Sequence, residues 1–198
     1  MKTYLEAIKS RRSIYSIEKS SPIPDARIVE LVQQAVLHTP SSFNMQGSRA
    51  VVLFGKHHDR LWSIVLETLR DKVPKAQFAQ TKKKIQSFAD GYGTVLFFDD
   101  TAVTNRYGEK FALYKENFPV WAQQSNGILQ YNVWNLLEDA GLGATIQHYN
   151  PLIDKAVRRE WDLPESWLLI AQMPFGAPAG EPGEKLFQPV EERMCVFS

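Results

Sequence analysis

The segment Thr39–Gln46 connects a helical pattern to an apolar one and is rich in polar side chains. Four of them carry hydroxyl or amide groups: Ser41, Ser42, Asn44 and Gln46. Hydroxyls and side-chain amides donate and accept hydrogen bonds, which suits a flat heteroaromatic ring edged with carbonyls and ring nitrogens. The same residues could form an ordinary polar loop with a serine cap. The segment alone leaves both interpretations open.

Basic residues near the start of the chain could bind a phosphate group. Arg11, Arg12 and Ser13 follow a short helical pattern, and a guanidinium offers a planar fork of donors that matches a phosphate. The alternative is a basic helix end that interacts favourably with the helix dipole. Lys185, taken by itself, is interpreted as a solvated surface lysine.

A glycine pair and a polar run follow the longest helical pattern. Gly141 and Gly143 frame one leucine, and no third glycine completes a dinucleotide-binding fingerprint. The run 147–150, Gln-His-Tyr-Asn, then separates a short strand from a helix. His148 as the base of a hydrolase triad is an alternative, but no nucleophile elbow accompanies it.

Other potential metal ligands are interpreted as structural. Asp99 and Asp100 follow an apolar strand without a third ligand at a useful spacing, which favours a capped turn. His57 and His58 point about 100° apart on a helix and are predicted to be surface residues. Cys195 is the only cysteine, which excludes an internal disulfide and zinc-site spacing. No metal site is predicted.

Apolar periodicity predicts helices at 4–10, 25–37, 57–69, 74–88, 120–140 and 152–161. Apolar runs predict strands at 49–54, 93–98 and 166–173, the last ended by Pro174. Residues 191–197, with the apolar run at 194–197, suggest a last edge strand that could be added to the sheet of a neighbouring subunit. The helix at 120–140 is apolar on several sides and nearly uncharged, which predicts a central helix at a dimer interface. Residues 100–119, aromatic and charged, could form a lid or an excursion packed on a partner subunit.

The composition predicts one globular domain spanning residues 1–198, with 44% hydrophobic and 12% aromatic residues. A formal charge of +1 gives no indication of binding to nucleic acid or membrane. The sequence has no apolar signal-peptide core and no run of membrane-spanning length, so a cytoplasmic location is expected.

In their order along the chain, these motifs resemble those of the flavin-dependent nitroreductase family. Residues 41–46 resemble its Ser-Ser-x-Asn-x-Gln segment, and Arg11 to Ser13 its Arg-x-Ser phosphate element. Residues 141–143 resemble its Gly-Leu-Gly element, after which a strand end lies against the flavin ring. The runs at 147–151 and 172–176 are similar to a fungal-type branch that also has bacterial members.

The resemblance implies an α+β fold, with a central mostly antiparallel sheet flanked by helices, in an intertwined homodimer with flavin at the interface. It implies no catalytic side chain. Tyr15 stands where the family usually has a basic residue. The implied cofactor-binding residues are Arg11, Arg12, Ser13, Tyr15, Ser41, Ser42, Asn44, Gln46, Gly143, Gln147, His148 and Lys185.

The activity implied is that of an oxidoreductase with tightly bound flavin mononucleotide (FMN). NADH or NADPH would reduce nitroaromatics, quinones or both by ping-pong hydride transfer. The alternatives are a flavin-binding regulatory or stress-response protein with little turnover, and the hydrolase that would use His148.

Overall fold

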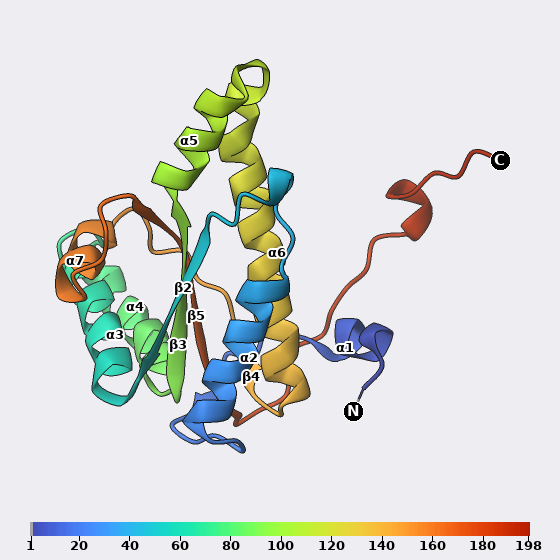
Figure 1. Ribbon diagram of the computed structural model, residues 1–198. Coiled ribbons are helices and arrows are strands. Elements are labelled where there is room, and N and C mark those ends of the chain that lie inside the picture. The colour runs from blue at the N-terminus through green and yellow to red at the C-terminus, as the bar shows by residue number, and fades with distance from the viewer. Residues whose placement is uncertain (1) are drawn as a thin grey trace.

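In residues 2–198, the part of the chain that the computed structural model describes, five strands form one sheet (Figure 1). The strand order is β1-β5-β3-β2, with β4 also paired to β5, and every ladder is antiparallel. The strands are β1 (Ile17–Glu18), β2 (Ser48–Phe54), β3 (Gly93–Asp100), β4 (Gly143–Ala144) and β5 (Trp167–Pro178).

Strand β3 is buried on both faces, which explains its continuous apolar run. Val95 and Phe97 point into one core cluster, whereas Leu96 and Phe98 point into the other. Alternate residues of a strand face opposite sides of a sheet, so helices must cover both faces. The sheet is therefore the middle of three layers.

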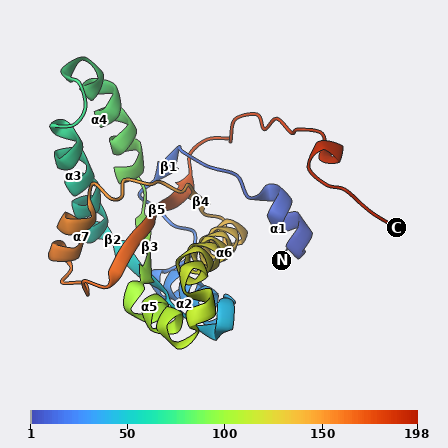
Figure 2. The same ribbon diagram turned by 90° about the horizontal axis from the view of Figure 1, so that it is seen from above.

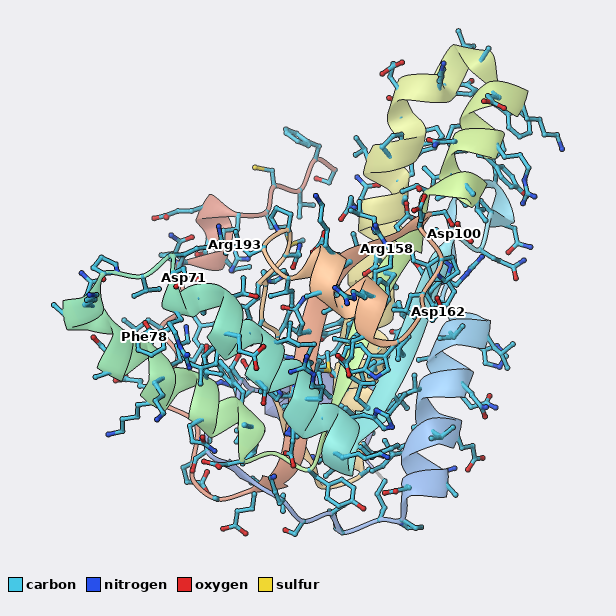
Figure 3. The ribbon with its side chains drawn as sticks, turned by 90° about the vertical axis from the view of Figure 1, so that its left-hand side faces the viewer. Asp71, Phe78, Asp100, Arg158, Asp162 and Arg193 are labelled. Atoms are coloured by element: carbon cyan, nitrogen blue, oxygen red, sulfur yellow. The ribbon has the colours of Figure 1, made fainter. Side chains whose placement is uncertain are left out.

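Helices cover the two faces as separate groups (Figure 2). On one face lie α2 (Asp25–His38) and α6 (Phe118–Asp139), which supply Ile28, Leu129 and Leu137 to the core. On the other lie α3 (Gly55–Arg70), α4 (Lys75–Ala89) and α7 (Asp154–Glu160), seen in Figure 3. This architecture confirms the predicted α+β class and the helix-flanked antiparallel sheet, while the homodimer stays a prediction.

A helical excursion, residues 101–117, projects beyond one end of the sheet (Figure 1). It consists of α5 (Thr101–Lys110) and the 3-10 helix η2 (Ala112–Asn117). Within the described chain it packs on the first turns of α6 through a third apolar cluster around Phe118 and Ala122. Among residues 2–198, none of the helices combines the length and apolar character that crossing a membrane requires.

The two ends of the chain lie away from the sheet (Figure 1). Helix α1 (Tyr4–Ser10) buries none of its residues, and Lys2 Nζ lies 2.5 Å from Glu138 Oε1 of α6. Past β5 the chain is extended apart from the 3-10 helix η3 (Val190–Glu192). Its side chains Leu186 and Phe197 are 85% and 96% exposed. Both ends expose apolar surface that the described chain does not cover.

The C-terminal edge strand has no neighbour within the described chain, where residues 194–197 form no strand, so its addition to the sheet of a neighbouring subunit stays a prediction. The predicted end of one other strand was wrong. Strand β5 does not end at Pro174 but continues to Pro178. Pairing beyond the proline maintains it, since β4 pairs at Gly176 and β1 at Pro178.

His58 is a core residue, so its predicted surface position was also wrong. Its side chain is 1% exposed and bridges α3 and β3. Its Nδ1 lies 2.9 Å from Thr94 Oγ1, and its Nε2 lies 3.2 Å from the Ala89 carbonyl oxygen. These partners satisfy both ring nitrogens, and burial lowers the pKa of the imidazole.

Candidate functional site

The polar loop, residues 41–46, has an unusual backbone. Phe43, Asn44 and Gln46 have φ values of 55°, 50° and 52°, in the left-handed region that residues with a side chain rarely occupy. Three local hydrogen bonds close the loop. The Asn44 N–H donates to the Ser41 carbonyl at 2.9 Å, the Met45 N–H to the Ser42 carbonyl at 3.1 Å, and the Gln46 N–H to Ser41 Oγ at 2.9 Å. Ser41 therefore acts structurally in this loop.

The side chains of the polar loop separate by chemistry. Met45 is 4% exposed and packs in the apolar cluster of α6 and the excursion. Phe43 packs on the rings of the same cluster. The side chains of Asn44 and Gln46 are exposed. The apolar residues thus anchor the loop and leave its amides exposed, with Gln46 Nε2 donating to the Asn44 carbonyl at 3.4 Å.

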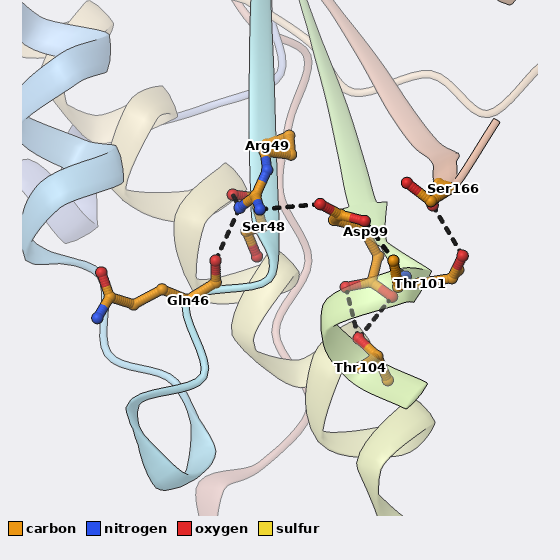
Figure 4. A network of polar contacts seen from close by, with 9 residues as sticks. Gln46, Ser48, Arg49, Asp99, Thr101, Thr104 and Ser166 are labelled. Atoms are coloured by element: carbon orange, nitrogen blue, oxygen red, sulfur yellow. Dashed lines mark hydrogen bonds and ion pairs between the residues drawn. The ribbon is translucent and has the colours of Figure 1, made fainter. Parts of the chain in front are cut away.

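Arg49 of β2 fixes the exit of the polar loop (Figure 4). Its Nη1 donates to the Gln46 carbonyl at 2.7 Å, and its Nη2 donates to Asp100 Oδ2 at 2.9 Å. Asp100 Oδ1 in turn accepts from the Ala102 N–H at 3.2 Å and caps α5, which confirms the predicted capped turn. The sequence indicated only a strand at Arg49, because its partner Asp100 is distant in the chain.

The neighbouring Asp99 is 4% exposed and accepts from Thr104 Oγ1 at 3.0 and 3.1 Å (Figure 4). Burial raises the pKa of this carboxyl group. A Cβ at Gly47 would lie 3.1 Å from Asp99 Oδ1, so the chain leaves the polar loop close to this carboxylate. Asp99 therefore packs beneath the end of the polar loop and has a structural role there.

A second group of predicted site residues lines one open groove of about 540 Å³, termed the basic groove. Arg12 donates to the Gly183 carbonyl and so holds the C-terminal segment against the residues after α1, although the two positions are 171 apart in the sequence. Glu184 is the one acidic side chain of the lining. The predicted residues in this groove are Arg11, Arg12, Ser13, Tyr15 and Lys185.

Arg11 differs from the other basic residues of the groove. Its guanidinium carbon lies 4.2 Å from the ring centroid of Trp134 and 5.9 Å from that of Tyr131, both on α6. In the part of the chain that the structure describes, its buried Nε has no hydrogen-bond partner. Arg11 therefore joins the groove to α6 by a cation–π contact.

The Gly143–His148 segment lies beside the basic groove. Ser13 forms a parallel bridge with Ala144, and the Ile14 N–H donates to the Ala144 carbonyl at 3.0 Å. A Cβ at Gly143 would lie 2.9 Å from Ile14 Cγ2, so the close approach here is to the chain itself. His148 lies four residues beyond Ala144, at most about 13 Å further along an extended backbone.

Gln172 of β5 holds this segment by main chain and side chain. The Gln147 N–H donates to the Gln172 carbonyl at 2.7 Å, and the Tyr149 N–H donates to Gln172 Oε1 at 2.7 Å. The Gln147 N–H is therefore not free for a ligand. His148 is exposed, and within residues 2–198 its N–H donates to no acceptor.

Gln147 has a structural environment, with its side chain 8% exposed and Nε2 donating to Thr145 Oγ1 at 3.2 Å. Burial raises the pKa of the neighbouring Tyr149 to about 12, so its phenol is neutral. Of the two predicted amides at this strand end, only that of His148 is free. The Gln-x-Pro-Phe-Gly run drew attention to Gln172 in the sequence. The run could not show that Gln172 forms hydrogen bonds with Gln147 and Tyr149.

The polar loop and the basic groove lie at opposite ends of α6 within one chain. The loop packs near Trp121, through Phe43, while the groove is joined near Trp134, through Arg11. These two tryptophans are thirteen positions apart on the helix, which corresponds to about 20 Å. One chain therefore groups the predicted residues as two half-sites.

Comparisons with known proteins identify the family of the chain. The model of the Nitroreductase family matches residues 8–177. HBN1 of Saccharomyces cerevisiae is 37% identical over 187 residues, 93% of each chain. The nitroreductase FRM2 of the same organism is 34% identical over 189 residues, 93% of this chain and 92% of that protein.

A solved structure of the nitroreductase CinD from Lactococcus lactis in complex with chloramphenicol is 40% identical, with a TM-score of 0.90. The alignment covers 99% of this chain and all of CinD. These matches span nearly the whole chain and support an oxidoreductase function. The protein belongs to the nitroreductase family.

Proposed function

We propose that this protein is an FMN-dependent oxidoreductase that uses NADH or NADPH to reduce nitroaromatics, quinones or both. The observation that carries the proposal is the basic groove, in which Arg11, Arg12 and Ser13 meet Lys185 from the other end of the chain. In a member of the nitroreductase family, such a set of cationic and hydroxyl donors fits the phosphate of FMN.

The charges of the groove suit a phosphate. Two guanidinium groups and one ammonium group face a single carboxylate, that of Glu184, so the lining keeps an excess of positive charge. Arginine binds phosphate oxygens as a fork, and the Ser13 hydroxyl adds a donor. Tyr15, 54% exposed, offers a phenol donor in place of the basic residue usual at that position.

The donors for the flavin ring are the His148 N–H and the amides of Asn44 and Gln46. Bound FMN supplies a ring that accepts a hydride from NADH or NADPH and passes it to the oxidant. The protein orients the ring and adjusts its electronics through hydrogen bonds, so no side chain is assigned as acid or base. Ping-pong kinetics would follow if the electron donor leaves before the oxidant binds.

A homodimer completes the site in this proposal. The two half-sites lie about 20 Å apart along α6, so the polar loop of one copy would meet the basic groove of another. The exposed apolar side chains of α1 and the C-terminal segment support this arrangement, since Tyr4 is 70% and Phe187 is 75% exposed.

Ligands of related structures support the substrate class. CinD structures 38–40% identical to this chain hold chloramphenicol, 4-nitrophenol and nicotinic acid. The first two carry a nitroaromatic ring, and the third has a pyridine ring like that of the nicotinamide cofactors. A structure from Desulfovibrio desulfuricans in complex with FMN, 20% identical with a TM-score of 0.71, shares the fold.

Tyr15 favours a second candidate, a flavin-binding regulatory or stress-response protein with little turnover. With a phenol instead of a cation, the basic groove has one positive charge fewer than the family pattern implies. Bound FMN without oxidation of NADH or NADPH would support this candidate over the enzyme.

The double substitution Asn44→Ala with Gln46→Ala tests the assignment of the polar loop. It should weaken FMN binding or slow reduction by NADH at least about tenfold, because two amide contacts to the ring are lost. The matched control is Gln77→Ala with Gln80→Ala, two exposed amides on α4, which should change neither quantity. Equal behaviour of the two variants would remove the polar loop from the flavin site.

A further inference from the structure

One ring joins the polar loop to the excursion. The ring centroid of Phe43 lies 4.5 Å from that of Phe111, 5.5 Å from that of Phe118 and 5.9 Å from that of Trp121. Such separations between aromatic centroids are favourable, and tilted or offset pairs add to the energy of burial. Phe43 is therefore in contact with Phe111 of the excursion and with two rings of α6.

The backbone at Phe43 is strained, with a φ of 55° on a bulky residue. A residue in this region persists where its surroundings over-determine it, and such positions cluster at ligand sites. The aromatic contacts of Phe43 and the burial of Met45 are the surroundings that do so here. Asn44, which lies between them, is exposed.

We propose that Phe43 is a positioning residue, which couples the order of the excursion to FMN bound by the polar loop. The proposal rests on the proposed function, since it takes the polar loop as part of the flavin site. The packed rings of the excursion hold Phe43, and Phe43 holds the left-handed backbone that presents Asn44 and Gln46. Because coupling between two sites is reciprocal, FMN binding also orders the excursion, residues 101–117.

A double-substitution cycle tests the coupling through the affinity for FMN, measured by the quenching of flavin fluorescence. Phe43→Ala should weaken binding about tenfold, because the loop loses the contacts that fix its backbone. Phe111→Ala, more than sixty positions away, should weaken it about fivefold. The double variant should bind no more weakly than Phe43→Ala, since both changes remove the same contact.

The control is Leu113→Ala, in the same excursion but 86% exposed, which should bind FMN like the unchanged protein. The coupling would be overturned if Phe111→Ala binds FMN as tightly as this control. It would also be overturned if the losses of FMN affinity from the two single substitutions multiply in the double variant. Should Phe43→Ala fail to fold, Phe111→Ala against Leu113→Ala still decides, because neither changes the polar loop.

Hydrogen exchange provides a readout independent of activity. FMN should slow amide exchange in the excursion of the unchanged protein, and Phe43→Ala should abolish this slowing at saturating FMN. FMN binding without any slowing in the excursion would overturn the inference while leaving the proposed function intact. A protein that binds no FMN at all would overturn the proposed function itself.

Discussion

Gln172 is the residue whose local role is clearest, because its side chain forms hydrogen bonds with the two residues that directly follow His148. Its Oε1 accepts from the Tyr149 N–H, and its Nε2 donates to Asn150 Oδ1 at 3.3 Å. The side chain is fully buried. A buried glutamine that meets a strand end in this way fixes where the free His148 amide points.

Substitution of this residue, Gln172→Ala, should lower the free energy of unfolding by about 1–3 kcal/mol, because the Tyr149 N–H loses its acceptor in a partly buried position. Urea unfolding followed by circular dichroism measures the loss. Gln77→Ala, an exposed amide, should change the free energy by less than about 0.5 kcal/mol. If the two variants are equally stable, the clamp contributes nothing.

Arg49 illustrates a half-buried ion pair that supports a loop. Arg49→Ala should destabilise the protein by about 1–2 kcal/mol and weaken FMN binding, because the Gln46 carbonyl loses its donor. The matched control is Arg27→Ala, which breaks an exposed pair with Glu30 at 2.7 Å and should cost about 0.5 kcal/mol or less. Equal losses in both variants, with unchanged FMN affinity, would contradict this role of Arg49.

At the scale of elements, a buried polar bridge joins α3 to β3. Trp62 Nε1 donates to Thr94 Oγ1 at 3.1 Å, and the Thr94 hydroxyl forms a hydrogen bond with His58 Nδ1. The Ala89 carbonyl can only accept, so His58 Nε2 carries the proton directed at it, and burial lowers the pKa of the imidazole. Asp59 and Lys19 are the charged groups that act on it.

The lowered pKa of His58 predicts a pH dependence of stability. The imidazole has a pKa of about 6.5 in the unfolded chain and a lower pKa in the folded chain. Below about pH 6.5 the unfolded chain therefore binds a proton that the folded chain does not bind, and the folded state loses stability as the pH falls. His58→Gln should have less of this loss between about pH 7 and about pH 5. His38→Gln, an exposed histidine of α2, should retain it. If His58→Gln loses as much stability at low pH as the unchanged protein, other groups cause the pH dependence.

Most elements were predictable from the sequence, because their burial leaves a local pattern. The run 93–98 indicates a strand since both faces are covered, and the pattern at 120–140 corresponds to α6. His58 was missed because a histidine counts as polar until its partners Thr94 and Ala89 are known. The strand expected at 194–197 required a neighbour that the sequence cannot supply.

The candidate site was predictable only through the resemblance. Residue types alone left the polar loop and the arginines open to structural interpretations, and the structure brings Arg11 to Tyr15 together with Lys185. Contacts between residues far apart in the sequence, such as that of Arg49 with Asp100, cannot be inferred from local sequence patterns. Their binding of a cofactor stays a prediction.

At the scale of the whole molecule, the basic groove brings residues from both ends of the chain together, and we propose that they bind the phosphate of FMN. The pair Arg12→Ala and Lys185→Ala should therefore weaken FMN binding at least about tenfold and leave the affinity for riboflavin, which lacks the phosphate, unchanged. Fluorescence titration measures both ligands. Lys75→Ala, an exposed lysine of α4, is the control. A parallel loss for riboflavin would mean that the groove does not hold the phosphate.

Whether the protein is a flavin enzyme can be measured by its absorption spectrum during anaerobic addition of NADH or NADPH. We expect flavin bands near about 375 and 450 nm that bleach on addition, because the bound cofactor carries the chemistry. Bands that persist with both donors would favour a binding protein with little turnover. A colourless protein that takes up no added FMN would contradict the proposed function.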